Sequence, residues 1–253
     1  MRRLLCVPLL LTLIAYIIVP VLAATTNQVW VKNDFEEAHW TKEVGFAIFY
    51  ENEKITLIPP STNGTKIWYY KTLDQLNNGT YPTEVYIYVK YNVTYTSTEN
   101  EDQIFNVHLK GVGGRVYDVG FGRWNSTSFY FLIRESINQT EKKVFVSSLP
   151  SEAVVYYDGQ FLIFFGGDGE VITTIETSEA TWDTGGGFKE FGFGVYRTDH
   201  TDILAYCVGN SLDAVLTGYL SGETTEIINA FVPVIVAVAM LSFALAMVKK
   251  FGG

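Results

Sequence analysis

Hydrophobic and polar residues alternate along most of the middle of the chain. The clearest case is EVYIYVKYNVTY, where alternate positions are apolar and the positions between them are more polar. A period of two indicates a β-strand with one buried face. We expect the buried set to be Val85, Ile87, Val89, Tyr91 and Val93, and the outward set to be Glu84, Tyr86, Tyr88, Lys90, Asn92 and Thr94.

Similar short segments follow one another from Val29 to about Thr217, separated by clusters of Gly, Asn, Asp, Pro or Ser. The other candidate strands are VGFAIFY, KITLI, KIWYY, IFNVHL, RVYDVGF, FYFLIR, KVFVSS, AVVYY, FLIFF, EVITTIE, FGFGVY, ILAYCV and LDAVLT. No helical period of useful length appears in this region. Many short strands with frequent turn signals predict an all-β fold, an antiparallel β-sandwich or jelly roll.

Two successive hairpins are predicted in VVYYDGQFLIFFGGDGEVITTIE. Asp158-Gly159 between apolar runs is a strong signal for a two-residue turn, because both residues tolerate positive φ. The segment Gly166–Gly169 is expected to close the second hairpin. The alternative, an ion-binding or phosphate-binding loop, lacks a second carboxylate and a following helix.

The first residues have the pattern of a secretory signal. MRRLLCVPLLLTLIAYIIVPVLA has a basic start, a long apolar stretch and a small residue at Ala23. We therefore predict a signal peptide over residues 1–23 and an extracellular domain over residues 24–220. Because the apolar stretch is long for a signal, an uncleaved anchor is the alternative.

A second apolar segment lies near the other end. Residues 227–248 contain no charge and are long enough to cross a bilayer as a helix. Residues 221–226 form a short linker before it, and Lys249 and Lys250 follow it, which places the tail 249–253 in the cytoplasm. A signal for lipid-anchor attachment is the competing interpretation. The small residues Ala239, Ser242 and Ala246 share one helix face and would suit a homo-oligomer contact.

Charge and cysteine usage narrow the function classes. The chain has 18 Lys and Arg against 27 Asp and Glu, a net charge of −9, so nucleic acid is a poor partner. Cys6 lies in the predicted signal, which leaves Cys207 alone in the mature chain. Cys207 sits in the apolar run ILAYCVG and is expected to be a buried core residue, the alternative being a reactive thiol.

Five Asn-X-Ser/Thr sequences mark candidate glycosylation sites, which are surface positions in a secreted chain. They begin at Asn63, Asn78, Asn92, Asn125 and Asn138.

Catalytic and metal-binding motifs are not found in the sequence. His39, His108 and His200 lack a metal-ligand spacing, and no cofactor motif occurs. TDHTD brings Asp199, His200 and Asp202 together, which suits a metal or acid–base site; a polar loop is the simpler interpretation. We therefore predict no metal site, no cofactor and no enzymatic activity.

The run of strands over Ile104 to Val208, with hairpins around DGQ and GGDGE, resembles the concanavalin A-like lectin and glucanase sandwiches. The resemblance implies a curved sheet whose concave face binds sugars. The glucanase carboxylate motif E-x-D-x-x-E is absent. Alginate-lyase-type relatives carry an Arg strand, a Q-[IV]-H strand and a Y-F-K-x-G-x-Y strand. This chain has LIRES at Arg134, NVH at His108 and FKEFGFGVY at Tyr196, with Asn106 in place of Gln and a different strand order.

These features together predict a single-pass, membrane-anchored surface glycoprotein at a cell surface or virion envelope. Its composition resembles that of surface proteins of archaea or archaeal viruses. The expected role is structural or adhesive, with glycans or neighbouring surface proteins as partners. Trp124 and Trp182 are candidates for stacking on a sugar, although core packing is the default for each. The alternatives are a membrane-tethered polysaccharide-cleaving enzyme and a receptor subunit that acts through a partner.

Overall fold

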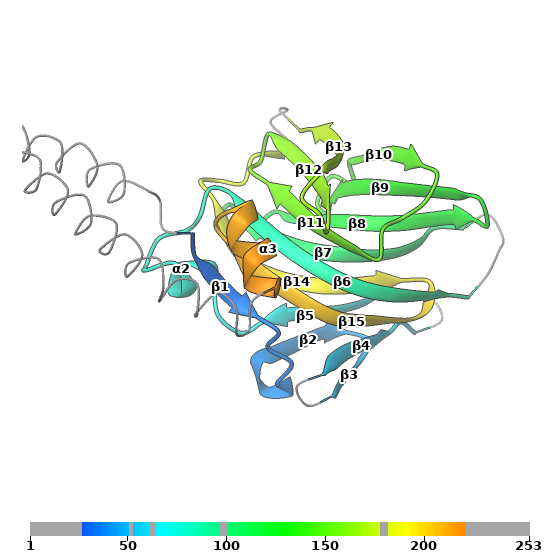
Figure 1. The fold of residues 1–253 in the computed structure, drawn as a ribbon, viewed down its shortest axis with the longest axis horizontal. Helices are drawn as coiled ribbons and strands as arrows, with labels where there is room; N and C mark the ends of the chain where they lie inside the picture. Colours follow the sequence, from blue (N-terminus) through cyan, green and yellow to red (C-terminus); the bar gives the residue numbers. More distant parts are fainter. Residues whose placement is uncertain (1–26, 51–52, 61–63, 97–100, 178–181, 221–253) are drawn as a thin grey trace, which may run out of the picture.

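The computed structural model places two antiparallel sheets face to face (Figure 1). It describes residues 27–50, 53–60, 64–96, 101–177 and 182–220. This architecture confirms the all-β sandwich that the alternating pattern predicts. The wider setting of a surface glycoprotein stays a prediction.

One sheet has eight strands. Its main path runs β13-β12-β11-β6-β15-β4-β3, and β1 pairs with β15 beside this path. The strands are β1 (Val29–Lys32), β3 (Phe46–Tyr50), β4 (Lys54–Ile58), β6 (Val85–Tyr95), β11 (Glu152–Tyr157), β12 (Phe161–Gly166), β13 (Val171–Glu176) and β15 (Thr198–Gly209).

The other sheet has seven strands in the order β10-β9-β8-β7-β14-β5-β2. Its strands are β2 (Trp40–Val44), β5 (Thr65–Tyr69), β7 (Gln103–Gly111), β8 (Val116–Asn125), β9 (Ser128–Glu135), β10 (Glu141–Val146) and β14 (Phe188–Tyr196). The short strands β1 and β2 were not among the predicted segments, because neither has an extended alternating pattern.

The core lies between the sheets and is rich in aromatic rings. The predicted inward residues of β6 all belong to the core or pack against it, which confirms the period-two interpretation. Rings from opposite sheets meet directly: Phe131 of β9 and Phe164 of β12 have centroids 4.4 Å apart, and Tyr91 of β6 lies 4.8 Å from Phe105 of β7. Aromatic burial of this kind is a large share of the stabilisation of a β-sandwich without disulfides.

Among the described residues, the helical elements are the 3₁₀ turn η1 (Glu37–His39), the short helix α2 (Leu73–Leu76) and α3 (Leu212–Leu220). Helix α3 corrects the prediction that LDAVLT is a strand. Ser211 accepts the backbone N–H of Ala214 through its hydroxyl, which caps the first turn, and Ala214 and Val215 are buried.

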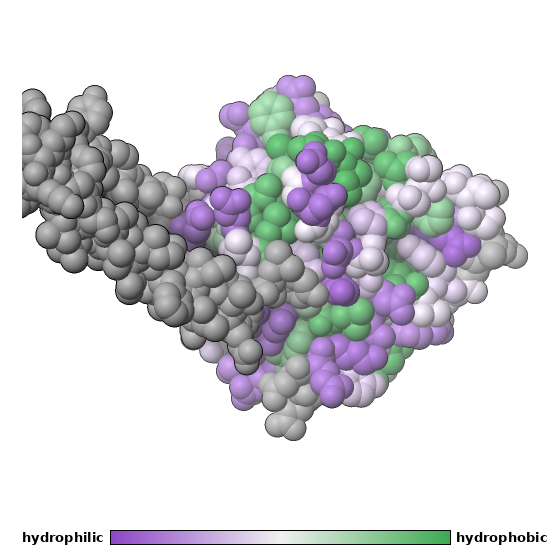
Figure 2. Space-filling view, viewed as in Figure 1, coloured by the Kyte–Doolittle hydropathy of each residue, from purple (hydrophilic) through white to green (hydrophobic). Residues whose placement is uncertain are grey.

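Helix α3 covers part of the outer face of the eight-stranded sheet (Figure 1). Beneath it, a second apolar cluster contains Tyr88, Val154, Ala205, Cys207 and Val215. Cys207 is fully buried, as its apolar surroundings predict, and burial raises the pKa of its thiol to about 12. Hydrophobic and hydrophilic residues are mixed on the face seen from this side (Figure 2).

Both predicted hairpins are present. In the first, Asp158 N–H bonds to the carbonyl of Phe161 at 3.4 Å, so the central turn residues are Gly159 and Gln160, one position later than expected. The Asp158 carboxylate accepts the backbone N–H groups of Gln160 and Phe161, and Gly159 has φ 88°. The second hairpin closes through Gly166 and Gly169.

Several predictions fall on residues that the structure does not describe. They are the signal peptide 1–23, the linker 221–226, the segment 227–248 with Ala239, Ser242 and Ala246, the tail with Lys249 and Lys250, and Asn63. Within the described ranges, no helix is long and apolar enough to cross a membrane. Of the other glycosylation candidates, Asn78, Asn92 and Asn138 are exposed and Asn125 is half-buried.

Trp182 is a core residue. Its side chain is 0% exposed, and its ring packs beside Tyr117 at a centroid distance of 6.4 Å. This corrects the prediction that Trp182 could contact a glycan, because a fully buried ring has no face to offer. Trp124, at the end of β8, is 39% exposed and stays a candidate.

We predict that Trp182→Ala destabilises the fold by about 3–5 kcal/mol, because it leaves a large cavity in the core. Trp124→Ala should change the free energy of unfolding by no more than about 0.5 kcal/mol. Urea unfolding of the full-length protein, followed by circular dichroism, measures both changes. Equal effects of the two substitutions would contradict the assignment of Trp182 to the core.

Candidate functional site

The outer face of the seven-stranded sheet carries the polar residues that the core excludes. In β7, Phe105, Val107 and Leu109 are buried between the sheets. Because successive side chains of a strand point to opposite faces, Asn106 and His108 project from the outer face. The same alternation places polar residues of β5, β8 and β9 on that face.

Strand register arranges these residues in two rows across the sheet. The first row contains Trp68, Gly192, His108, Asp118, Arg134 and Glu141, in that order. The second contains Lys66, Gly194, Asn106, Gly120, Leu132 and Lys143. Residues more than a hundred positions apart in the sequence thus become neighbours.

Glycines of β14 make room for the neighbouring side chains. A Cβ at position 194 would lie 2.0 Å from Nε2 of His108 and 2.7 Å from Oδ1 of Asn106. At Gly192, the rings of Trp68 and His108 come together from the two adjacent strands, with centroids 5.6 Å apart. Gly194 therefore leaves space for the side chains of His108 and Asn106, whereas a Cβ at position 192 would meet the carbonyl oxygen of Ile67.

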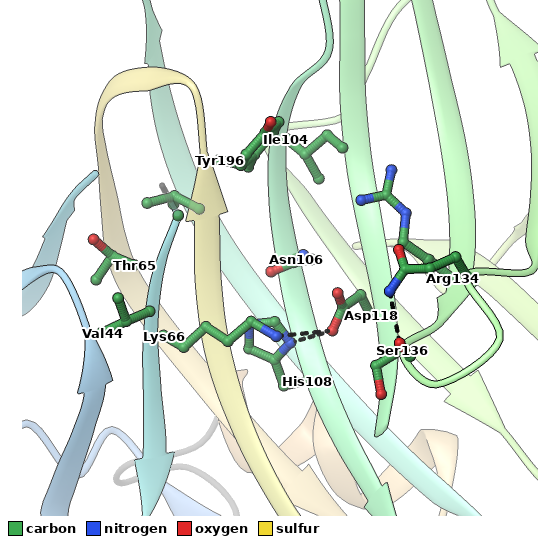
Figure 3. Close-up of a pocket in the computed structure, with 13 residues that line it drawn as sticks. Val44, Thr65, Lys66, Ile104, Asn106, His108, Asp118, Arg134, Ser136 and Tyr196 are labelled. Carbon is green, nitrogen blue, oxygen red and sulfur yellow. Dashed lines mark hydrogen bonds and ion pairs between the residues drawn. The ribbon is translucent and has the colours of Figure 1, made fainter. Parts of the chain in front are cut away.

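A pocket of about 220 Å³ opens on this face (Figure 3). Strands β5, β7, β8, β9 and β14 and the turn after β9 supply most of its wall. The lining residues are Val44, Gly64, Thr65, Lys66, Ile104, Asn106, His108, Asp118, Arg134, Ser136, Gln139, Val195 and Tyr196.

His108 and Asp118 form a buried pair at the bottom of the pocket. Nδ1 of His108 lies 2.6 Å from Oδ1 of Asp118, and the His108 side chain is 1% exposed. Burial alone would raise the pKa of Asp118, but His108, Lys66 and Arg134 together outweigh it, so the pKa lies below its usual range. With Asp118 charged, Nδ1 of His108 carries a hydrogen and donates a hydrogen bond to the carboxylate.

Two polar atoms in this pocket are buried without a hydrogen-bond partner: Nε2 of His108 and Oδ1 of Asn106. Both lie near the position that a Cβ of residue 194 would occupy. An unpaired buried acceptor costs free energy, so two in one place mark a site that is not optimised for stability alone.

Arg134 lies at the other side of the pocket and is held by β10. Its Nε donates to Oε2 of Glu141 at 2.9 Å, and Nη2 donates to the same oxygen. Lys143 contacts Oε1 of Glu141 at 3.0 Å and Asp102 at 3.1 Å. These contacts fix the orientation of the guanidinium group.

The structure brings together the three residues that carry the lyase resemblance, since His108, Arg134 and Tyr196 line one pocket. It also adds Lys66 and Asp118, which no sequence motif marks. Trp68 packs beside His108 but is not one of the residues that line the pocket. Trp124 is not among the lining residues.

The TDHTD segment lies elsewhere, on the eight-stranded sheet, and it is part of β15 rather than the loop we expected. Asp202 accepts hydrogen bonds from Lys54 at 2.9 Å and Thr56 at 2.5 Å, and His200 bonds to Asp199. Among the described residues, no cluster of three or more His, Cys, Asp and Glu side chains could hold a metal ion.

We predict that Asp118→Asn lowers stability at neutral pH and that the difference from the wild type shrinks in acid. Because the folded pKa of Asp118 lies below its unfolded value, its contribution is complete above about pH 4 and is lost as the pH falls through the folded value. Melting temperatures of both proteins across this range give the measurement. A difference that does not change with pH would show that the negative charge on Asp118 contributes little to stability.

No family model and no curated protein sequence matches this chain. Among solved structures, the CBM2 module of the evolved Dit of Lactobacillus casei BL23 phage J-1 matches 73% of this chain and 97% of its own, with 13% identity and a TM-score of 0.51. A lectin from Bauhinia forficata in complex with GalNAc covers 73% and 98%, with 14% identity and a TM-score of 0.48. The Crh5 transglycosylase in complex with NAG covers 72% and 83%, with 9% identity and a TM-score of 0.48. At such identities the likeness concerns the fold alone, an antiparallel β-sandwich.

Proposed function

We propose that the pocket on the seven-stranded sheet binds carbohydrate, and that the chain presents this domain at a cell surface or virion envelope. The observation that carries the proposal is the composition of the two rows around the pocket. They combine ring faces with fixed hydrogen-bonding groups, which is the combination that sugar recognition uses.

Trp68 and Tyr196 flank the polar groups from two sides. Trp68 donates through Nε1 to Glu43 at 2.5 Å, which fixes the orientation of its ring, and Tyr196 lies at the end of β14 in the pocket wall. Aromatic rings suit the C–H faces of sugars. Arg134 offers N–H donors, and Asp118 offers oxygen acceptors for hydroxyl groups.

Surface presentation is supported by the sequence rather than by the fold. The predicted signal at residues 1–23, the apolar segment 227–248 and the Asn-X-Ser/Thr sites agree on one topology, with the domain outside. Asn125 ends β8, and Asn138 lies in the turn after β9, between Ser136 and Gln139 of the pocket wall.

We predict that Trp68→Ala weakens glycan binding by about tenfold or more, because it removes the ring that packs beside His108. A glycan array with the full-length protein in detergent identifies a ligand, and titration then compares variants. Phe161→Ala, an exposed aromatic on the other sheet, is the matched control and should bind as the wild type does.

Trp124→Ala distinguishes two locations for the binding site. If this variant loses binding while Trp68→Ala keeps it, the site lies at the end of β8 and the pocket assignment is wrong. No binding on an array that includes neutral and acidic glycans would overturn the proposed function.

A second candidate is cleavage of a polysaccharide, and one observation favours it. His108, Arg134 and Tyr196 converge with Asn106 in one pocket, although they come from three strands far apart in the sequence. Asp118 holds His108 in the tautomer whose Nε2 has a free lone pair, which is the form that a general base requires. Nε2 is buried against β14, so the imidazole must shift before it can accept a proton from a substrate.

We expect, if this candidate is right, that incubation with a polysaccharide releases new chain ends and that His108→Ala abolishes the release. A double bond at the new non-reducing end indicates elimination, whereas saturated products indicate hydrolysis. Activity that survives in both His108→Ala and Tyr196→Phe would place the chemistry elsewhere or identify a contaminant.

A further inference from the structure

Lys66 differs from the other cations on the outer face of the seven-stranded sheet. It projects from β5, opposite Gly194, and its side chain extends across β14 and β7 toward β8 (Figure 3). Its Nζ ends 3.8 Å from Oδ1 of Asp118, and the side chain is 29% exposed. That separation is too long for a hydrogen bond, and Nζ has none to the described residues.

The oxygen nearest to Nζ of Lys66 already accepts a hydrogen bond from another residue. The same Oδ1 of Asp118 accepts the Nδ1–H group of His108 at 2.6 Å. By contrast, Arg134 has Glu141, Lys110 has Glu190 at 3.1 Å, and Lys143 has Asp102 at 3.1 Å. Lys66 therefore brings an ammonium group with unfilled donors into the pocket.

The weak contact with Asp118 makes Lys66 available to a ligand. A partly exposed ion pair beyond hydrogen-bond distance contributes little free energy, so exchanging it costs little. A hydrogen bond between an ammonium and an anionic oxygen is shorter and about twice as strong as a neutral one. When Lys66 turns toward a ligand, the carboxylate of Asp118 keeps its hydrogen bond from His108.

We propose that Lys66 makes the pocket selective for acidic sugar units, those that carry a carboxylate or a sulfate group. The inference rests on the proposed carbohydrate-binding function and names the ligand class of that site. Nζ of Lys66 binds the anionic oxygens, while Arg134 stays paired with Glu141. Neutral sugars contact the rings, Arg134 and Asp118 but give Lys66 no anionic oxygen, so they bind more weakly.

The test compares three probes that share a backbone. These are a polyuronate oligosaccharide, the same oligosaccharide after chemical reduction of its carboxyl groups, and a sulfated derivative of the reduced form. Binding is measured by calorimetry on the full-length protein in detergent. We expect the wild type to bind at least one acidic form about tenfold more tightly than the reduced form.

Lys66→Met should remove that preference, whereas Lys66→Arg should keep it. Lys110→Met, which removes a paired lysine of the same face, is the matched control and should keep the preference. A preference that survives Lys66→Met, or a wild type that binds all three probes equally, overturns the inference but leaves carbohydrate binding intact. Failure to bind any probe or any array glycan overturns both.

Discussion

The antiparallel pairing of β14, β7, β8 and β9 is the constraint on which the site depends. Core burial of Phe105, Val107 and Leu109 fixes which face of β7 points inward, so Asn106 and His108 must project outward. A slip of one residue would exchange the two faces and bury the polar set. The aromatic packing that stabilises the sandwich therefore also positions His108 opposite Asp118, and Asp118 opposite Arg134.

The site works against stability in two respects. Glycine in the interior of a strand loses entropy and contributes no packing, yet Gly192 and Gly194 follow each other on one face of β14. A Cβ at position 194 would meet His108 and Asn106, and a Cβ at position 192 would meet the backbone of Ile67 in β5. Unpaired buried atoms on both side chains add a further cost. Local departures of this kind from good packing are typical of functional sites.

Alternation along single strands was sufficient to predict the sandwich, its hairpins and the inward set of β6. It failed at LDAVLT, where six residues fit either period and tertiary contact with β15 and β6 favours the helix α3. The pocket was only partly predictable. Motif resemblance marked His108, Arg134 and Tyr196. Lys66 and Asp118 join them in the pocket through register, which no local pattern encodes.

Binding and cleavage make different demands on this arrangement. A binding pocket needs His108 only as a rigid, paired element that keeps Asp118 charged and supports the ring of Trp68. Cleavage needs Nε2, which lies against Gly194, to become accessible. The imidazole contacts the ring of Trp68, the carboxylate of Asp118 and the position of Gly194 in β14. Moving it to free Nε2 would therefore disturb its hydrogen bond with Asp118. The geometry therefore favours recognition over chemistry at this pocket.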